Sequence, residues 1–210
     1  MADRYTLLAE EFYLHQPDLV ARKLLGKLLV REIGGTALIG RIVEAEAYFG
    51  EDDPAAHTFV GKTARNEVLF GPPGHAYVYF IYGMHYCLNV SCEPDGKAGG
   101  VLFRALEPVA GLAEMARLRN LPIDSPPRLL TSGPGRMCQA LGITRTEFNG
   151  ADLTDLRSGL RIVEDGWTPE KIIATPRIGI NKAAERPLRF VIAGNPFVSV
   201  APRSAARLTI

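Results

Sequence analysis

Apolar and polar residues alternate along several short stretches of the chain, and this period of two predicts β-strands. Gly34-Gly35 separates the first two stretches and the Tyr82-Gly83-Met84-His85 turn separates a later pair, which predicts two β-hairpins. The predicted strands cover residues 27–33, 36–48, 76–81, 86–91, 101–106, 160–163, 177–180 and 188–193.

Helical spacing of apolar residues predicts three short helices. Gln16-Pro17-Asp18 opens the first helix and Gly26 ends it, because proline suits the first helical turn and glycine suits a C-terminal cap. The other two helices are expected over residues 108–119 and 136–141. Residues 49–74 are rich in glycine and proline and predict a loop, and loops of this length in compact domains are usually functional.

Short strands, hairpins and few helices together predict a mixed α/β (α+β) fold. We expect a single compact domain over residues 1–210, with a largely antiparallel, curved β-sheet, a protruding β-hairpin and surrounding helices. A length of 210 residues is enough for one substantial core. The hydrophobic content of 47% and the charged content of 22% are typical of globular proteins rather than of disordered chains.

Composition also narrows the classes of function. The three cysteines, Cys87, Cys92 and Cys138, form no C-x-x-C motif, so we expect no disulfide framework, no metal site and no cofactor. No stretch approaches the roughly 18 apolar residues of a membrane span, and we expect a cytoplasmic protein without membrane association. The net charge of +1 does not itself indicate nucleic acid. Residues 106–210 are mildly basic, which suits a phosphate footprint but equally an ordinary solvated surface.

The strand predicted over residues 36–48 carries two glutamates on one face. A period of two places Glu44 and Glu46 with Tyr48 on the same side, and the Cα atoms of the glutamates are then about 6.6 Å apart. That separation suits hydrolysis by two carboxylates with a water between them. Glutamates in such a motif more commonly face solvent or pair with an arginine. The flanking apolar residues favour partial burial, which raises a carboxyl pKa and suits a general base.

Tyrosines are concentrated in the segment between residues 48 and 86, which holds five of the seven in the chain. Tyrosine joins a flat stacking face to a polar tip, and bases extruded from nucleic acid are held between such faces. For Tyr77 and Tyr86, ordinary strand propensity is the preferred explanation.

Three polar residues in or beside the predicted strands are further candidates. His57, in the long loop, suits a general acid, a stacking face or a hydrogen-bonded structural group. Asn89 is unusual in mid-strand and either closes a local polar network or contacts the edge of a ligand. Arg104 lies in an apolar strand and needs an anionic partner if buried, which is Glu46, a phosphate or both.

Long motifs containing these residues follow one another in a fixed order. The chain resembles bacterial-type members of the alkyladenine (3-methyladenine) DNA glycosylase family, and the resemblance extends from about Leu19 to Ser199. The motifs that carry it are residues 41–50, 53–57, 77–90, 101–108, 132–136, 139–141, 176–180 and 188–190.

The resemblance implies a role for each candidate residue. Glu46 corresponds to the carboxylate that activates water, and Arg104 to the group that positions this water and the DNA backbone at the lesion. Around the base, the resemblance implies pocket walls from Tyr48, His57 and Tyr79, a residue disfavouring a guanine 2-amino group at Asn89, and a DNA-intercalating hairpin tip of Tyr82 and Met84. We expect phosphate contacts from Lys62, Arg65, Arg136, Arg177 and Lys182.

A member of this family would act in base-excision repair on double-stranded DNA that contains an alkylated or deaminated purine. It would flip the damaged nucleotide and hydrolyse its N-glycosidic bond, which leaves an abasic site. We expect a monofunctional enzyme without strand cleavage, because no lysine falls in the active-site motifs. We also expect a monomer that associates with the nucleoid when it acts.

Two alternatives remain open from the sequence. One is a non-catalytic nucleic-acid-binding module of the same fold, since fold does not dictate function. The other is an inverting sugar hydrolase that uses Glu44 and Glu46 together. The first alternative predicts binding without released base, and the second predicts that both glutamates are equally essential.

Overall fold

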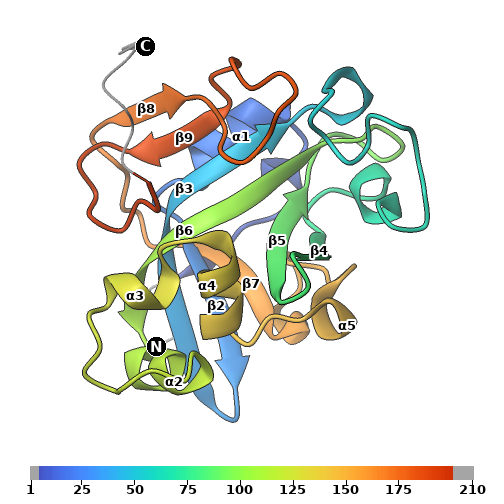
Figure 1. The fold of residues 1–210 in the computed structure, drawn as a ribbon. Coiled ribbons are helices and arrows are strands. Elements are labelled where there is room, and N and C mark those ends of the chain that lie inside the picture. Colours follow the sequence, from blue (N-terminus) through green and yellow to red (C-terminus); the bar gives the residue numbers. More distant parts are fainter. Residues whose placement is uncertain (1–4, 201–210) are drawn as a thin grey trace.

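The computed structural model describes residues 5–200 and contains one curled sheet in which all pairings are antiparallel (Figure 1). The main path of the sheet follows the order β1-β7-β2-β3-β6-β5-β4, and β9 branches from β3 and pairs with β8. The strands are β1 (Thr6–Leu7), β2 (Leu28–Ile33), β3 (Thr36–Tyr48), β4 (Ala76–Ile81), β5 (His85–Ser91), β6 (Gly100–Ala110), β7 (Leu160–Glu164), β8 (Ile172–Thr175) and β9 (Arg189–Ile192).

The α+β class and both predicted hairpins are confirmed. β2 and β3 pair from Leu28↔Arg41 to Ile33↔Thr36, with Gly34-Gly35 as the connecting turn. β4 and β5 pair up to Ile81↔His85 and form the second hairpin.

β3 is the central strand, with 13 residues and three partners. Its first half pairs with β2, nearly its whole length pairs with β6, and its segment from Glu44 to Glu46 pairs with β9. β6 and β9 therefore both pair with β3 at Glu44, and the register with β6 is irregular on either side of this residue. Glu44 and Glu46 therefore lie in the interior of the protein, and neither side chain is exposed to solvent.

The helices are short and pack against the sheet. They are α1 (Pro17–Leu24), α2 (Leu112–Leu118), α3 (Arg128–Thr131), α4 (Pro134–Ala140) and α5 (Arg145–Phe148), with 3₁₀ turns η2 (Glu10–Phe12), η3 (Gly50–Asp52), η4 (Glu67–Phe70) and η5 (Leu156–Ser158). α1 buries Val20, Ala21 and Leu24 at helical spacing and contacts β3, whereas α4 contacts β5 and β6. Figure 1 shows α2, α3 and α4 gathered together, away from β8 and β9. Within residues 5–200, no helix has the length and hydropathy that crossing a membrane requires.

The helix predicted over residues 108–119 is partly wrong. β6 continues to Ala110 because the long β3 offers it partners, with Gly40 opposite Pro108 and Arg41 opposite Glu107. The helix begins only after Gly111, whose φ of 78° breaks the strand. A β-carbon at Gly111 would lie 2.5 Å from Leu38 Cδ2, so glycine also permits this close approach.

The strand predicted over residues 177–180 is wrong as well. The ordered strand in this region is β8, which ends at Thr175 before Pro176. Arg177 instead turns inward to a carboxylate, and the Ile178 backbone N–H donates to the Glu46 side chain rather than to a neighbouring strand. These tertiary contacts replace the backbone hydrogen bonds that a β-strand would form with its neighbours.

Candidate active site

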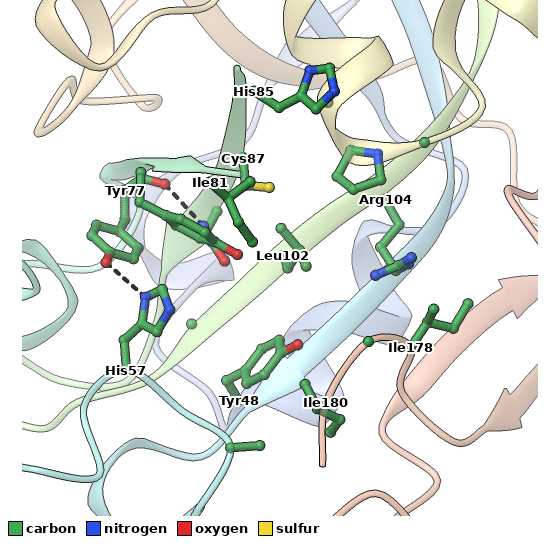
Figure 2. Close-up of a pocket in the computed structure, with 18 of the residues that line it drawn as sticks. Tyr48, His57, Tyr77, Ile81, His85, Cys87, Leu102, Arg104, Ile178 and Ile180 are labelled. Atoms are coloured by element: carbon green, nitrogen blue, oxygen red, sulfur yellow. Dashed lines mark hydrogen bonds between the residues drawn. The ribbon is translucent and has the colours of Figure 1, made fainter. Parts of the chain in front are cut away.

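A cavity of about 610 Å³ opens between β3–β6, the β4–β5 hairpin, the loop that follows β3, and the segment that follows β8. Its size falls within the range of about 300–1,000 Å³ that is typical of small-molecule sites. Figure 2 shows His57 and Tyr77 on one side of the cavity and Arg104 and Ile178 on the other, with Tyr48 at its lower edge.

The Glu46 carboxylate lies directly behind the wall of this cavity. The Tyr48 hydroxyl donates to Oε2 at 2.9 Å, and the Ile178 backbone N–H donates to Oε1 at 2.8 Å. Arg104 Nη1 lies 3.3 Å from the same Oε1. All three donors belong to residues that line the cavity, so the carboxylate faces it through their side chains and backbone.

Burial raises the pKa of Glu46 above its ordinary value. Arg104, the Ile178 N–H and the Tyr48 hydroxyl each lower the pKa but do not outweigh burial, and nearby Glu44 raises it further. A carboxylate in this setting is a stronger base than an exposed glutamate, as a residue that takes a proton from water requires.

Arg104 bridges two carboxylates. Its Nε donates to Glu44 Oε1 at 3.0 Å while its Nη1 lies against Glu46. Burial alone would lower the pKa of Arg104, but the carboxylates of Glu46 and Glu44 outweigh burial and raise it. The guanidinium therefore stays charged, and its anionic partners are the two glutamates.

Aromatic rings form the opposite wall. His57 Nδ1 and the Tyr77 hydroxyl share a hydrogen bond of 2.9 Å, and the His57 ring meets the Tyr79 ring edge-on at a centroid distance of 4.6 Å. Burial, and then the charge of Arg65, lower the pKa of His57, so its imidazole is neutral at pH 7. These contacts hold the rings in fixed orientations around the cavity.

Asn89 also lines the cavity, on β5. Its Nδ2 donates to the Tyr77 carbonyl oxygen at 3.1 Å, which ties β5 to β4 beneath the aromatic wall. Asn89 thus closes a local polar network and is at the same time placed to contact the edge of a ligand.

Tyr82 and Met84 lie at the tip of the second hairpin, where 79% and 70% of their surfaces are exposed. Tyr82 and Gly83 both have positive φ, 54° and 68°, and the Met84 N–H donates to the Ile81 carbonyl. This geometry is that of a type I′ turn, which matches the twist of the strands and projects the tip beyond the sheet. Tyr82 lines the mouth of the cavity as well.

The predicted phosphate contacts divide into two groups. Lys62, Arg65, Arg136 and Lys182 are exposed, and Arg136 lies at the cavity. Arg177 is the exception, and its prediction is corrected here. Its side chain is buried, its two terminal nitrogens are bound by Asp53, and Nη1 also donates to the Ala47 carbonyl.

The Arg177–Asp53 pair fixes the loop that follows β3. Burial raises the pKa of Asp53, but the hydrogen bonds and charge of Arg177, together with the backbone N–H groups of Ala55 and Phe49, outweigh burial and lower it overall. The Arg177 guanidinium also lies 4.5 Å from the centre of the Tyr48 ring, and the pair thereby supports one wall of the cavity.

The sequence did not single out Arg119 or Ile178. Arg119 follows α2 and lines the cavity, with Nη1 donating to Gln139 Oε1 at 3.0 Å. Its neighbours in the chain carry no recognisable signal for a site. Ile178 acts through its backbone N–H, and a backbone group cannot be identified from a side-chain pattern.

Glu44 does not line the cavity. Its oxygens accept hydrogen bonds from Arg104, Arg189 and Ser199, and of these only Arg104 lines the cavity, whereas all three partners of Glu46 line it. Among residues 5–200, no group of three or more His, Cys, Asp or Glu side chains comes together where a metal ion could bind.

The aromatic cavity and the buried carboxylate behind its wall fit an enzyme of the DNA glycosylase class. The methylpurine-DNA glycosylase family model matches residues 11–196. The chain therefore belongs to the methylpurine-DNA glycosylase family.

Several relatives of similar length carry the name "Putative 3-methyladenine DNA glycosylase". The protein from Koribacter versatilis is 59% identical over 192 residues, which cover 91% of this chain and 92% of the relative. The protein from Methanocella arvoryzae is 50% identical over 197 residues, 92% of this chain and 96% of the relative. The protein from Burkholderia cenocepacia is 48% identical over 195 residues, 92% of this chain and 91% of the relative.

Proposed function

We propose that this protein excises alkylated or deaminated purines from double-stranded DNA by flipping the damaged nucleotide and hydrolysing its N-glycosidic bond with a water activated by Glu46. One observation carries the proposal: the Glu46 carboxylate is buried, and each of its three hydrogen-bonding or ion-pairing partners lines the cavity. A ring held in the cavity would bring its sugar to this carboxylate.

Access to the base comes first. Flipping costs a few kcal/mol and costs least for damaged pairs, because their stacking and pairing are already weakened. Tyr82 is exposed at the hairpin tip beside the cavity mouth, so its ring can fill the gap that the nucleotide leaves. Met84 adds apolar surface to the same tip.

Recognition follows inside the cavity. An alkylated purine carries positive charge, and the electron-rich faces of Tyr48 and Tyr79 attract such a ring. His57 is held neutral by burial and therefore does not repel the cation. Asn89 lines the cavity, and we expect its side-chain amide to disfavour a guanine 2-amino group.

Hydrolysis then requires one water. The water oxygen bonds to the sugar C1′, the C1′–N bond breaks, and its electron pair stays on the purine. A cationic alkylated purine leaves as a neutral base, whereas a neutral lesion such as hypoxanthine leaves as an anion that takes up a proton from solvent. Glu46 accepts the proton of the water, and its charge also stabilises the cationic character of the sugar in the transition state. A single displacement inverts C1′ and leaves an abasic site.

Glu46 has no exposed surface, so the attacking water must displace one of the three donors that hold the carboxylate. The Tyr48 hydroxyl is the neutral side-chain donor of the three and is the partner that a water can replace at the lowest cost. Among the described residues that line the cavity there is no lysine, which accords with hydrolysis by water rather than through a Schiff base.

One copy of the chain contains every part of this site. We therefore propose that the protein acts as a monomer on nucleoid DNA in the cytoplasm. Lys62, Arg65, Arg136 and Lys182 would contact backbone phosphates around the flipped nucleotide.

The test uses duplexes that carry 3-methyladenine, 7-methylguanine, hypoxanthine or ethenoadenine, with free base measured by chromatography. The wild type should release at least one of these bases, and Glu46→Gln should reduce the single-turnover rate by about 10²–10⁴-fold, as expected for loss of a general base. Lesion-duplex affinity should be retained. Salt-sensitive binding by the wild type without any released base would reject the enzymatic proposal.

A further inference from the structure

Glu44 is a buried carboxylate that the proposed hydrolysis does not use. Oε1 accepts hydrogen bonds from Arg104 Nε at 3.0 Å, Arg189 Nε at 2.7 Å and Ser199 Oγ at 2.9 Å. Oε2 accepts the Ser199 backbone N–H at 2.6 Å. Three segments of the chain, β6, β9 and the residues after β9, thus meet at one side chain of β3.

We infer that Glu44 is a positioning residue: it holds the Nε edge of Arg104 so that the Nη1 edge stays against Glu46. In this way Glu44 determines the charges that surround Glu46 when Glu46 takes a proton from water. The inference rests on the proposed function of Glu46. A guanidinium is planar and rigid, so anchoring Nε determines where Nη1 points. Without the anchor, Arg104 retains one ion-pair partner and gains rotational freedom.

The charges alternate along this chain of contacts. Arg189, Glu44, Arg104 and Glu46 follow one another as cation, anion, cation and anion. Each buried charge therefore has an opposite neighbour, which is the condition under which buried ions are tolerated. Arg104 is shared between two carboxylates, so the presence of Glu44 limits how strongly Arg104 favours the ionised form of Glu46.

Other groups also face the two glutamates. The Tyr48 hydroxyl and the Ile178 N–H reach Glu46 from β3 and from the segment after β8. The charge of Arg177 and the titratable thiol of Cys87 also interact electrostatically with Glu46 from neighbouring segments. None of these groups contacts Glu44, so a change at Glu44 reaches Glu46 through Arg104 and through direct charge repulsion.

The direction of the effect follows from the charges. Glu44→Gln removes an anion that repels the Glu46 carboxylate, and this loss of repulsion outweighs the looser hold on Arg104. The ionised form of Glu46 becomes easier to reach, so its pKa falls and its strength as a base falls with it. The acid limb of the pH–rate profile should move to lower pH, and the plateau rate should fall by about tenfold, well short of the loss from Glu46→Gln.

The experiment measures single-turnover base release across pH for the wild type, Glu44→Gln and Glu44→Asp. Glu44→Asp keeps the charge and should keep the acid limb at its wild-type position. Ser199→Ala is the matched structural control, because it removes a hydrogen bond from the same Oε1 without changing any charge; it should lower thermal stability and leave the limb in place. An unmoved limb in a folded Glu44→Gln variant would overturn the inference.

A rate loss in Glu44→Gln equal to that in Glu46→Gln would also overturn it, because Glu44 would then take part directly in the reaction. If Glu44→Gln does not fold, Arg189→Gln tests the same chain from its other end. Loss of this cation leaves the negative charge of Glu44 less compensated, so Glu44 repels the Glu46 carboxylate more strongly and the limb should move to higher pH. No shift, or a shift in the same direction as for Glu44→Gln, would contradict the inference.

Infrared titration of the Glu46 carboxyl gives a readout that does not depend on activity. Its band is assigned by its disappearance in Glu46→Gln, and it should titrate at lower pH in Glu44→Gln than in the wild type. A shifted band in a protein that releases no base would support the positioning role of Glu44 and reject the proposed function separately. An unshifted band rejects the positioning role whatever the activity.

Discussion

At the scale of single residues, the site depends on a carboxylate that is unstable where it lies. Glu46 has lost its contact with water, and three donors replace only part of that hydration. Because burial exceeds their combined effect, the pKa of Glu46 stays raised in the folded protein. The same feature that makes the residue a good base therefore lowers the stability of the fold.

This relation predicts how stability depends on pH. A raised folded pKa favours the protonated form, so the stabilising effect of protonated Glu46 is complete below its ordinary value of 4.5 and is lost as the pH rises through the folded pKa. Glu46→Gln mimics the protonated form and should raise the melting temperature at pH 7–8 but not at pH 4.

Thermal unfolding across this pH range provides the measurement, with Glu11→Gln as a control at an exposed glutamate. The control should show no gain at any pH. A stability gain in Glu46→Gln that is the same at pH 4 and pH 8 would contradict a raised pKa.

At the scale of elements, the second hairpin and the loop after β3 present the working parts. The β4–β5 hairpin holds Tyr79 and Asn89 toward the cavity and carries Tyr82 at its tip. The loop after β3 carries His57 and is held by the buried pair of Asp53 and Arg177. Each element thus combines a packed base with an exposed end, so we expect contact with DNA to be separable from stability.

The hairpin separates these functions in a testable way. Tyr82→Ala removes an exposed ring, so it should weaken binding to a lesion duplex by about tenfold while the melting temperature changes little. Phe80→Ala is the matched control on the same hairpin, because Phe80 packs on Tyr86 rather than standing at the tip. Fluorescence anisotropy gives the affinities. Equal weakening by both variants would argue against a wedge at the tip.

For the loop after β3 we expect a substitution to lower stability rather than DNA affinity. Asp53→Asn leaves the Arg177 charge buried without an anion, so unfolding in urea should show a loss of about 3 kcal/mol. Asp155→Asn breaks an exposed ion pair with Arg157 and should cost far less. Similar losses of unfolding free energy in the two variants would show that the buried Arg177–Asp53 pair does not stabilise the loop after β3.

At the scale of the whole molecule, the net charge of +1 conceals an asymmetric arrangement. The exposed cations lie at or near the cavity: Arg136 borders it, and Lys62, Arg65 and Lys182 lie on the segments that form its walls. The buried arginines Arg104, Arg177 and Arg189 are instead paired with carboxylates of the protein. We therefore expect electrostatic attraction of DNA to depend on a few local cations and not on the overall charge.

Salt dependence tests this arrangement. Each phosphate contact contributes about −0.9 to the slope of log K against log salt, so Arg136→Gln should make the slope shallower by about that amount. Arg157→Gln, at an exposed arginine that lies outside the cavity, should leave it unchanged. Equal slopes for Arg136→Gln and the wild type would remove Arg136 from the phosphate contacts.

Local patterns in the sequence were sufficient for much of the fold. The alternation over residues 36–48 and 76–81 predicted β3 and β4 with their observed bounds, since strand residues and glycine turns act on their immediate neighbours. The predictions failed at residues 108–110 and 177–180. There, partners distant in the sequence, β3 for the first segment and Asp53 and Glu46 for the second, determine the conformation.

The chain by itself determined the candidates for the chemistry: a glutamate pair on one strand, clustered tyrosines, and Asn89 and Arg104 in apolar surroundings. Tertiary structure alone decided their state. It buried both glutamates, gave Arg104 two carboxylate partners, committed Arg177 to Asp53 and brought the Ile178 backbone to Glu46. The reason is physical: residue type specifies what a group can donate, accept or titrate, whereas burial and long-range partners specify its charge and its neighbours.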